Sequence, residues 1–333
     1  MRATPPSFDL LVVGDVNPDV VVGPLTGPLA FGQREQLVST GLLTLGGSAA
    51  IMACGAARLG LKVAFAGRIG ADDTGAYVRA ALAARGVNTD ALRVDPDLPS
   101  PLTAVLNRAA EGGAAGGDRA ILTAPGTLGA TTGDDVPAAL LADCRHVHAA
   151  SYFLMPKLAA ALPELFRTAR GHGATTSLDT NDDPAGRWDP AGLAAVLPVT
   201  DYLLPNAQEA RALSGEEGLE RAAAELAAHG PVAVVKNGAD GALAHDGRTL
   251  LRAPAVPVTP LDSVGAGDSF DAGLVAGVLA GLPLAGALAL AAACGAMSTR
   301  AHGGTGAQPT WDEALAASRT TAPEAGHDHG ETS

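Results

Sequence analysis

Short apolar runs alternate with helical patterns along most of this chain of 333 residues, and the alternation limits the folds open to it. Leu10–Val13 has the pattern of a buried strand, Ala49–Leu59 that of a helix rich in small residues, and Val63–Ala66 that of the next strand. Thr74–Ala84 is again helical, with Gly86 as the stop. Strands separated by helices predict βαβ units, a mostly parallel sheet and right-handed crossovers.

The same pattern continues through the second half of the chain. Further strands are expected near Val147–Ala149, Thr175–Leu178, Tyr202–Leu204 and Val232–Val235, with helices between them. In open parallel sheets, ligands bind beyond the carboxyl ends of the strands. We therefore predict an α/β fold whose functional residues follow those strand ends.

Two segments, 20–44 and 102–122, have only weak helical periodicity. The second has the pattern of a hairpin, in which LTAVLNR and RAILT flank the glycine-rich loop AAEGGAAGGD. Such strands are expected to form a small separate sheet that covers the opening of a site. Without an internal repeat or a linker rich in proline or charge, the chain is expected to form one domain, residues 1–333.

Charge and composition argue against several kinds of partner and compartment. The formal net charge is −13, whereas a nucleic-acid binder normally carries a basic patch. The three cysteines (Cys54, Cys144 and Cys294) form no CxxC pair, which indicates buried free thiols in a reducing compartment. The first residues lack the pattern of a signal peptide, so we expect a cytoplasmic protein.

The segment Ala272–Thr299 carries no charge and invites a membrane interpretation. The sequence Gly281-Leu282-Pro283 divides it, so we expect two buried core helices and no membrane partner. His146 and His148 are expected to flank a strand and to be structural, and residues 318–333 are expected to be a disordered tail.

The stretch DSVGAGD (262–268) carries the sharpest chemical signal. A Gly-Ala-Gly run lets backbone N–H groups converge on an anion, and the helix that follows adds its dipole. Transfer of a phosphoryl group to a hydroxyl needs such a cradle and a base within reach, and Asp268 is placed to be that base. The simpler alternative is that Asp268 only caps the helix. The stretch lacks the GK[ST] of a Walker A loop, and GDVNPD (14–19) after the first strand lacks GxGxxG, which disfavours a Rossmann oxidoreductase.

DSVGAGDSFDAG (262–273) closely resembles the C-terminal signature of the ribokinase-like (PfkB) carbohydrate kinases. The resemblance extends, in family order, over roughly residues 9–315. It also rests on GDVNPD (14–19), GGSAAIMACGAARLG (46–60), GRIGADDTG (67–75), NAQE (206–209), VVKNGADGAL (234–243) and TRAHGGTGAQPT (299–310). It implies a three-layer α/β/α fold with a mostly parallel central sheet and a small β lid, and the activity of an ATP-dependent sugar kinase.

The resemblance also implies the catalytic roles. Asp268 would be the base that deprotonates the acceptor hydroxyl. The backbone of Gly265, Ala266 and Gly267 would form the anion hole for the transferred phosphoryl group.

Further roles follow from the resemblance for the nucleotide and its ions. Asn206 and Glu209 would organise Mg²⁺ and phosphate, largely through water. Lys236, Gly238 and Gly241 correspond to the nucleotide-binding strand and turn. Asp179 and Asn181, in LDTND, resemble a strand-end position that lies near the phosphates in some relatives.

The remaining implied roles concern a monovalent cation, the acceptor and a second subunit. Asp262 would lie near a monovalent-cation site, typically K⁺, shared with the 299–305 loop. The lid of this family often pairs two subunits, which implies a homodimer. A sugar-like acceptor would contact the following residues: Asn17, Asp19, Gly46, Gly47 and Ile51.

Ile51 departs from the family pattern. The N-terminal signature usually reads GGxxxN, and this chain has GGSAAI. An apolar side chain cannot replace the hydrogen bonds of the amide, and an unpaired buried hydroxyl costs about 1–3 kcal/mol. The acceptor is therefore expected to carry fewer hydroxyls there, or an apolar group.

Several alternatives stay open at this point. A nucleoside kinase of the same fold is the nearest rival, and a non-catalytic ligand-sensing relative is the alternative from a different class. Structural interpretations also remain: Asn206 with Glu209 as a helix capping box, Lys236 as a solvated lysine, Asp19 as a turn residue, and Asp262 as a turn or cap.

Overall fold

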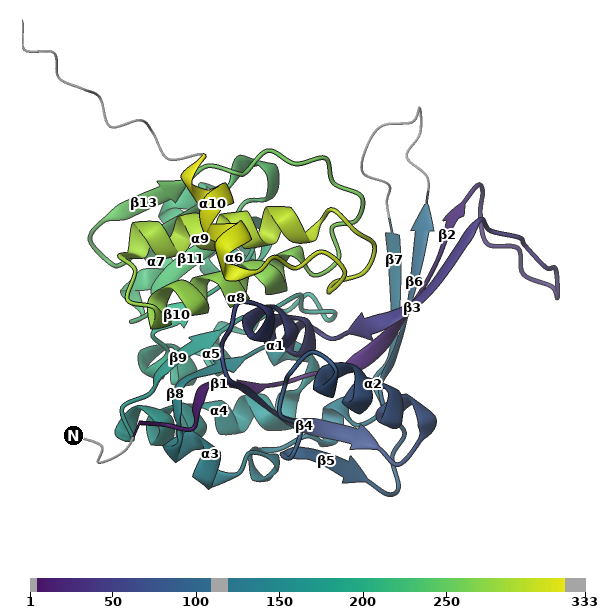
Figure 1. The fold of residues 1–333 in the computed structure, drawn as a ribbon, viewed down its shortest axis with the longest axis horizontal. Helices are drawn as coiled ribbons and strands as arrows, with labels where there is room; N and C mark the ends of the chain where they lie inside the picture. Colours follow the sequence, from purple (N-terminus) through teal and green to yellow (C-terminus); the bar gives the residue numbers. More distant parts are fainter. Residues whose placement is uncertain (1–4, 109–118, 321–333) are drawn as a thin grey trace, which may run out of the picture.

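The computed structural model describes residues 5–108 and 119–320, and its main body is built on a nine-stranded sheet (Figure 1). The strands are β1 (Phe8–Val13), β4 (Val63–Gly70), β5 (Leu92–Asp95), β8 (Cys144–Ala149), β9 (Thr175–Leu178), β10 (Tyr202–Leu203), β11 (Val232–Lys236), β12 (Ala242–His245) and β13 (Leu250–Ala253). Their order is β13-β12-β11-β10-β9-β8-β1-β4-β5. Neighbours from β11 to β5 are parallel, and β12 and β13 extend the sheet as antiparallel strands.

The helices form two layers, because the side chains of each central strand point alternately to opposite faces. On β1, Leu10 and Val12 belong to one core and Leu11 and Val13 to the other. Helices α1 (Ser48–Arg58), α2 (Asp73–Ala83), α8 (Ala266–Leu279), α9 (Leu284–Ser298) and α10 (Trp311–Arg319) cover the first face. Helices α3 (Ala138–Ala142), α4 (Pro156–Gly171), α5 (Pro190–Val196), α6 (Ala207–Ser214) and α7 (Leu219–Ala228) cover the second. This is the predicted three-layer α/β/α fold.

A second sheet projects from one side of the main body (Figure 1). It consists of β2 (Asn17–Leu25), β3 (Thr40–Gly46), β6 (Leu102–Arg108) and β7 (Arg119–Ala124), in the order β3-β2-β6-β7. We call it the small sheet. Strands β6 and β7 pair antiparallel, as the hairpin pattern predicts, and the predicted loop, residues 109–118, lies outside the described residues. Strand β2 begins three residues before the expected segment, so it carries Asn17 and Asp19.

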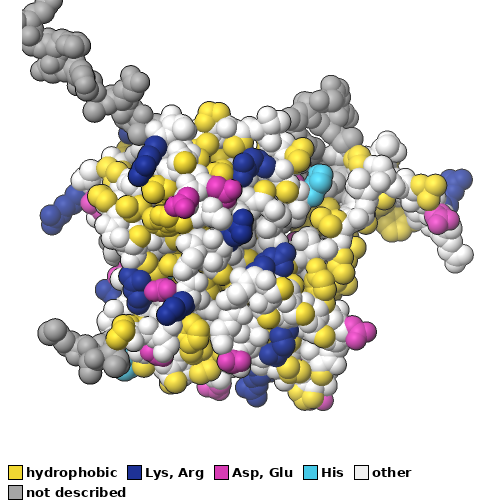
Figure 2. Space-filling view, in the orientation of Figure 1, with side chains coloured by type: hydrophobic (Ala, Val, Ile, Leu, Met, Phe, Trp, Pro, Cys, Tyr) yellow, Lys and Arg dark blue, Asp and Glu magenta, His cyan; other side chains and the backbone are white. Residues whose placement is uncertain are grey.

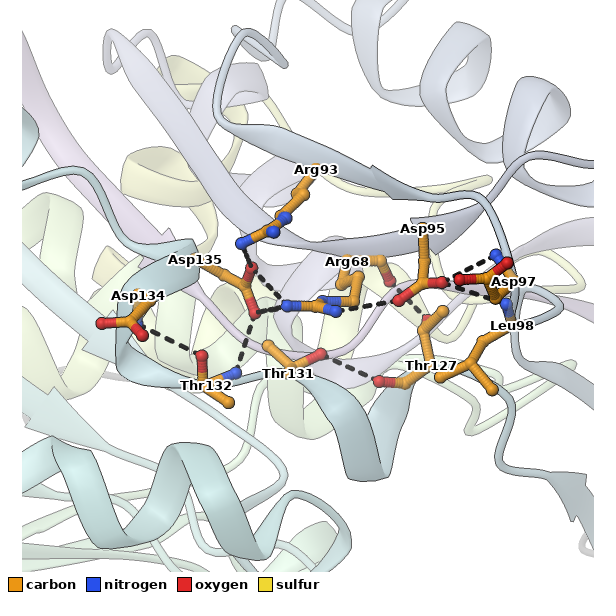
Figure 3. Close-up of polar contacts among 10 residues, drawn as sticks. All are labelled: Arg68, Arg93, Asp95, Asp97, Leu98, Thr127, Thr131, Thr132, Asp134 and Asp135. Atoms are coloured by element: carbon orange, nitrogen blue, oxygen red, sulfur yellow. Dashed lines mark hydrogen bonds and ion pairs between the residues drawn. The ribbon is translucent and has the colours of Figure 1, made fainter.

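An ion-pair network anchors both ends of the β6–β7 hairpin to the main body (Figure 3). Arg68 on β4 lies 2.8 Å from Asp95, which precedes the hairpin, and 2.8 Å from Asp135, which follows it. Arg93 adds a 3.1 Å contact to Asp135, and the Thr127 hydroxyl donates to the Arg68 carbonyl at 2.7 Å. The Asp135 side chain is fully buried, so its charge depends on these partners. The network fixes where the small sheet leaves the body.

The apolar segment Ala272–Thr299 forms parts of two helices, as expected. Gly281 adopts φ 79° and Pro283 precedes α9, which ends one helix and starts the next. Within residues 5–108 and 119–320, no helix is long and apolar enough to cross a membrane. On the face in Figure 2, lysine and arginine side chains are scattered among acidic and apolar ones.

Three local expectations can be compared with the structure. Cys54, Cys144 and Cys294 are buried free thiols, as expected. His146 and His148 lie inside β8 rather than beside a strand, and both bond the Ser177 hydroxyl, which supports a structural role. Helix α10 runs to Arg319, so the predicted tail begins two residues too early, and residues 321–333 lie outside the described part.

Candidate active site

The glycine loop 265–267 turns sharply into α8 and places Asp268 in the first helical turn. Gly265 is the N-cap of α8 and has φ 72°, a left-handed conformation that favours glycine. A Cβ on Gly265 would lie 2.6 Å from Gly304 Cα, so the crowded loop also needs a glycine there. Because Gly265 is the N-cap, the interpretation of Asp268 as the cap is wrong. The free N–H groups of this helix end can face an anion.

Asp268 is buried, with 8% of its surface exposed. Burial raises the pKa of its carboxyl well above the usual value, and the charges of Asp179 and Asp15 act in the same direction. Lys236 and a hydrogen bond from the Ser48 side chain oppose the rise in pKa. The carboxyl therefore sits in an environment that favours proton uptake, which suits a base that must accept a proton.

Lys236, at the end of β11, is a buried partner in an ion pair and not a solvated lysine. Its Nζ lies 2.6 Å from Asp179 Oδ2 and 3.2 Å from Asp271 Oδ1. Although burial opposes it, these two carboxylates raise the pKa of Lys236, so the side chain stays charged. A Cβ on Gly267 would be 3.4 Å from Lys236 Nζ, which puts a fixed cation directly against the glycine loop.

Asn206 and Glu209 form the capping box of α6. The Asn206 side chain accepts from the backbone of Glu209, and Glu209 accepts from the Asn206 backbone at 2.8 Å and from its amide nitrogen at 2.5 Å. The structural interpretation of this pair is therefore confirmed. Burial raises the pKa of Glu209 to about 7, helped by the negative Asp179 and opposed by Lys236. A cation beside Glu209 would relieve this repulsion.

Asp262 joins two loops. Its Oδ1 accepts from Val264 N at 3.0 Å and its Oδ2 from Gly303 N at 2.9 Å, so it ties the glycine loop to the 299–305 segment. Arg119 of the small sheet lies 3.9 Å from Asp262 Oδ1. Within the described residues, no group of three or more His, Cys, Asp or Glu side chains could hold a metal ion.

A cavity of about 550 Å³ lies against the glycine loop. Its lining includes Gly267 of the loop, Lys236, and Gly238 and Gly241 from the turn after β11. The remaining wall is mainly apolar: Ala255, Val256, Pro257, Val258, Pro260, Phe270, Ala292 and Ala296. A mainly apolar pocket lined by a few polar groups is typical of a small-ligand site.

The start of β2 brings Asn17 and Asp19 toward the same region. Asn17 Nδ2 donates to Asp19 Oδ1 at 2.8 Å and to Thr103 Oγ1 at 3.1 Å, which fixes both side chains. Burial raises the pKa of Asp19 to about 6, and the neighbouring charge of Asp15 adds to the rise. A Cβ on Gly46 would lie 2.0 Å from Asp19 Oδ1, so a larger residue there would displace this carboxyl.

Gly47 and Asp15 shape the start of α1. Gly47 has φ 88° and precedes the helix without a side-chain cap. The buried carboxylate of Asp15 supplies the missing acceptor, because it receives the N–H groups of Ser48 and Ala49, each at 3.0 Å. Burial raises the pKa of Asp15, while these donors lower it.

Ile51 is 3% exposed and packs on the two loops of the site. A Cβ on Gly304 would be 2.5 Å from Ile51 Cδ1, and one on Gly265 would be 2.9 Å from Ile51 Cγ2. The side chain is therefore turned to the glycine loop and its neighbour. Sequence reasoning assigned it only an acceptor contact and did not foresee this packing.

Sequence reasoning also missed three side chains of this site. Asp15 stands inside the motif GDVNPD, but its role at the start of α1 depends on contacts with Ser48 and Ala49 that the motif does not reveal. Asp271 lies three residues after Asp268, so the helical period alone places the two carboxylates on one face. Ser48 carries no sequence signal, because its partners come from distant strands.

Comparison with known proteins agrees with this geometry. The pfkB family carbohydrate kinase model matches residues 7–311. The ATP-dependent ribose-1-phosphate kinase of Halopiger xanaduensis is 31% identical over 307 residues, which cover 92% of this chain and 97% of that protein. The ribokinase of Bacillus subtilis is 28% identical over 309 residues, with coverage of 92% and 97%.

Solved structures share the fold. Arabidopsis thaliana ribokinase, complexed with ribose and ATP, matches with a TM-score of 0.79 and 22% identity, covering 95% of this chain and 99% of that chain. Fructokinase with bound ATP from Xylella fastidiosa matches with a TM-score of 0.79, 22% identity and the same coverage. Since the family match spans nearly the whole sequence, the chain belongs to the pfkB family of carbohydrate kinases.

Proposed function

We propose that this protein transfers the γ-phosphoryl group of ATP to a hydroxyl of a small sugar or sugar-like acceptor. The observation that carries the proposal is the position of Asp268: it is buried in the first turn of α8, directly after the left-handed Gly265. An anion cradle and a desolvated carboxylate thus lie within one helical turn. In-line phosphoryl transfer needs both groups at that distance.

In the proposed step, the Asp268 carboxylate takes the proton of the acceptor hydroxyl. At the same time, the oxygen of that hydroxyl attacks the γ-phosphorus of ATP. The bond from the γ-phosphorus to the bridging oxygen breaks, and ADP leaves. The N–H groups of Gly265, Ala266 and Gly267 stabilise the negative charge on the transferred group. Lys236, held against Gly267, adds a fixed positive charge beneath that loop.

ATP is proposed to occupy the cavity of about 550 Å³ beside the loop, with Gly238 and Gly241 in its wall. Apolar walls suit a purine ring, and the Lys236 end suits phosphates. Mg²⁺ would be held near Asn206 and Glu209 and would neutralise charge on the phosphates. Both oxygens of Glu209 already accept hydrogen bonds, which favours contact through water, as Mg²⁺ permits.

A monovalent cation, typically K⁺, is proposed beside Asp262. Both carboxylate oxygens of Asp262 bind backbone N–H groups of the two loops that would surround the cation. Asp262 would therefore act mainly by shaping the loops. Backbone carbonyls of the 299–305 segment would supply the direct ligands.

The acceptor is proposed to bind between Asp268 and the start of β2. Asn17 and Asp19 would hydrogen-bond its hydroxyls, Gly46 and Gly47 would let it approach the backbone, and Ile51 would limit the hydroxyls on one side. A sugar acceptor is the favoured hypothesis, because two relatives are named ATP-dependent ribose-1-phosphate kinase and ribokinase. A nucleoside kinase and a ligand-sensing protein remain the competing hypotheses.

The small sheet is proposed to act as a lid and to pair two subunits in a homodimer. Cross-strand partners share a face, so Leu43, Leu102 and Leu122 lie on the face opposite Asp19. They are 54%, 41% and 59% exposed, so this face of the small sheet presents apolar side chains to solvent. The buried free thiols and the use of ATP favour the cytoplasm.

The proposal is tested by an acceptor screen. The purified protein is incubated with ATP, Mg²⁺ and K⁺ against pentoses, hexoses, ribose 1-phosphate, keto-deoxy acids and nucleosides, and ADP is measured. A sugar-like acceptor should give ADP in stoichiometric amounts, and Asp268→Asn should give none. Preferential turnover of a nucleoside would favour the nucleoside kinase, and tight binding without turnover would favour the sensor.

A further inference from the structure

Lys236 supplies the positive charge of the cavity beside the glycine loop. Among the described residues that line this cavity, it is the one lysine or arginine. Its Nζ would lie 3.4 Å from a Cβ on Gly267, so the ammonium is next to the backbone proposed to bind the transferred phosphoryl group. The position of this ammonium therefore decides how positive charge is presented to a phosphate in the cavity.

Two carboxylates hold the Lys236 ammonium, which has three hydrogens to donate. Asp179 Oδ2 accepts one at 2.6 Å, and the two oxygens of Asp271 share another at 3.2 and 3.3 Å. Within residues 5–108 and 119–320, these are the hydrogen-bond partners of Nζ. The third hydrogen is thus left for a group in the cavity, such as a phosphate oxygen.

Asp179, directly after β9, is held at both of its oxygens. Oδ1 accepts the backbone N–H of Asn181 at 3.1 Å, and Oδ2 accepts Lys236 Nζ and, more weakly, Asn181 Nδ2 at 3.4 Å. The Asp179 side chain is only 2% exposed, so these partners set its orientation. An amide in its place would have a single acceptor oxygen and could satisfy only one of the two main donors.

Asn181, two residues further on, has an unusual backbone that its contacts hold in place. Its φ is 54°, in the left-handed region, and such conformations persist in residues other than glycine where surrounding contacts enforce them. The Ser151 N–H donates to Asn181 Oδ1 at 2.7 Å, and Asn181 Nδ2 donates to Ser48 Oγ at 3.0 Å. Because a backbone N–H can only donate, the amide oxygen must face Ser151, which fixes the orientation of the amide.

We infer that Asp179 and Asn181 are positioning residues that hold the Lys236 ammonium beside the glycine loop, with one hydrogen available to a phosphate of ATP. Each link from the Ser151 N–H through Asn181 and Asp179 to Lys236 is a hydrogen bond of the structure. This inference rests on the proposed function and adds two residues that act on it through Lys236.

A role of Asp179 in charge balance alone makes the opposite prediction. Removing its charge would leave Lys236 with one competing carboxylate fewer, so the ammonium would attract phosphates at least as strongly as before. Turnover would then stay the same or rise, although the fold would lose stability. A positioning role predicts that turnover falls, because the ammonium is no longer held beside the loop.

The test measures kcat with ATP and the acceptor that the screen identifies, together with the Kd for ADP, in Asp179→Asn and Asn181→Gly. Asp179→Asn should lower kcat at least about tenfold. Asn181→Gly tolerates the left-handed backbone and keeps the N–H, so it should lower kcat less, by about threefold to tenfold. The Kd for ADP, which lacks the transferred group, should rise by no more than about twofold in either variant. Circular dichroism checks that both variants are folded.

A double-mutant cycle shows whether Asn181 acts through Lys236. In the Lys236→Met background, Asn181→Gly should lower kcat further by less than about twofold. Asn88→Gly is the matched control, because the Asn88 side chain also bonds an aspartate two residues away, Asp90, on the surface. This control should keep the wild-type kcat. If Lys236→Met does not fold, the comparison of the single variants still decides.

Wild-type or higher kcat in Asp179→Asn overturns the inference. Losses of kcat that simply multiply when Asn181→Gly and Lys236→Met are combined overturn it as well, because the two residues would then act independently. Retained turnover in Asp268→Asn instead overturns the proposed function itself, so the two failures are distinguishable.

Discussion

Lys236 Nζ and Asp179 Oδ2 lie 2.6 Å apart, in an ion pair whose side chains are almost fully buried. Asp271 closes the group on the other side of the ammonium at 3.2 Å. Although burial opposes it, Lys236 lowers the pKa of Asp179, whereas burial raises the pKa of Asp271 despite Lys236. The single ammonium of Lys236 therefore compensates the charge of two carboxyls that are almost fully buried.

We therefore expect Lys236→Met to lower the free energy of unfolding by about 3–5 kcal/mol at pH 8, because a buried carboxylate loses its partner. The loss should shrink at lower pH, since an unpaired buried carboxyl has a raised pKa and folding then favours its protonated form. Urea unfolding at several pH values measures both effects. Arg252→Met, in an exposed pair with Glu220, is the control and should change stability by about 0–1 kcal/mol.

Gly46 should strengthen acceptor binding, because it leaves room for the Asp19 carboxyl. In Gly46→Ala the new Cβ would lie 2.0 Å from Asp19 Oδ1, so the Asp19 carboxyl must move. We expect the KM for the acceptor to rise at least tenfold while the KM for ATP stays within about twofold. Gly41→Ala, on the same strand and with no atom within 4 Å of the new Cβ, is the matched control. Equal effects of the two variants on acceptor KM would contradict the assignment of Asp19.

The titration of Asp19 gives a pH dependence of known sign. Its pKa is raised from 3.8 to about 6 in the folded protein, so the folded state holds the proton more tightly than the unfolded state. This titration contributes at most about 3 kcal/mol to the free energy of unfolding. The contribution is fully present below pH 3.8 and is lost as the pH rises to about 6. The difference in unfolding free energy between wild type and Asp19→Asn, followed from pH 4 to 7, measures it. A flat difference would mean that Asp19 titrates normally.

Arg68 should stabilise the chain far more than a typical surface arginine. Arg68→Met leaves the fully buried Asp135 with Arg93 as its remaining cation and is expected to cost about 3 kcal/mol. Arg167→Met removes an exposed pair with Glu164 and should cost about 0–1 kcal/mol. Chemical denaturation measures the free energy of unfolding of both variants. If both lose a similar, small amount of stability, the ion-pair network around Arg68 adds little.

The order of strands and helices could be predicted because the apolar runs of β1 and β11 and the small residues of α1 are local patterns. The glycine loop and Asp268 could be located because glycine spacing is also local. The role of Lys236 could not, because its partners come from the end of β9 and from α8. The interpretation of Lys236 as a solvated lysine was wrong for the same reason, because the packing of α8 on the sheet decides how far this side chain is buried.

Ile51 and Ser48 illustrate the same limit inside one motif. The missing amide at position 51 is visible in the sequence, but its contact with Gly304 depends on a loop more than 250 residues away. Ser48 gains its hydrogen-bond partners, Asp15 and Asn181, from the segments that follow β1 and β9, which no spacing rule connects. The position of Asp19 on the small sheet was likewise hidden, because strand β2 begins earlier than its periodicity indicates.

The central claim is that Asp268 is the base of a phosphoryl transfer, and Asp268→Asn tests it most directly. Burial and the neighbouring carboxylates already disfavour the charged form of Asp268, so a neutral amide in its place should not prevent folding. With the acceptor at saturation, ADP formation and ATP binding are measured side by side. The account predicts a loss of turnover of at least about 10²-fold, with the Kd for ATP within a few-fold of wild type. Wild-type turnover in Asp268→Asn would contradict it.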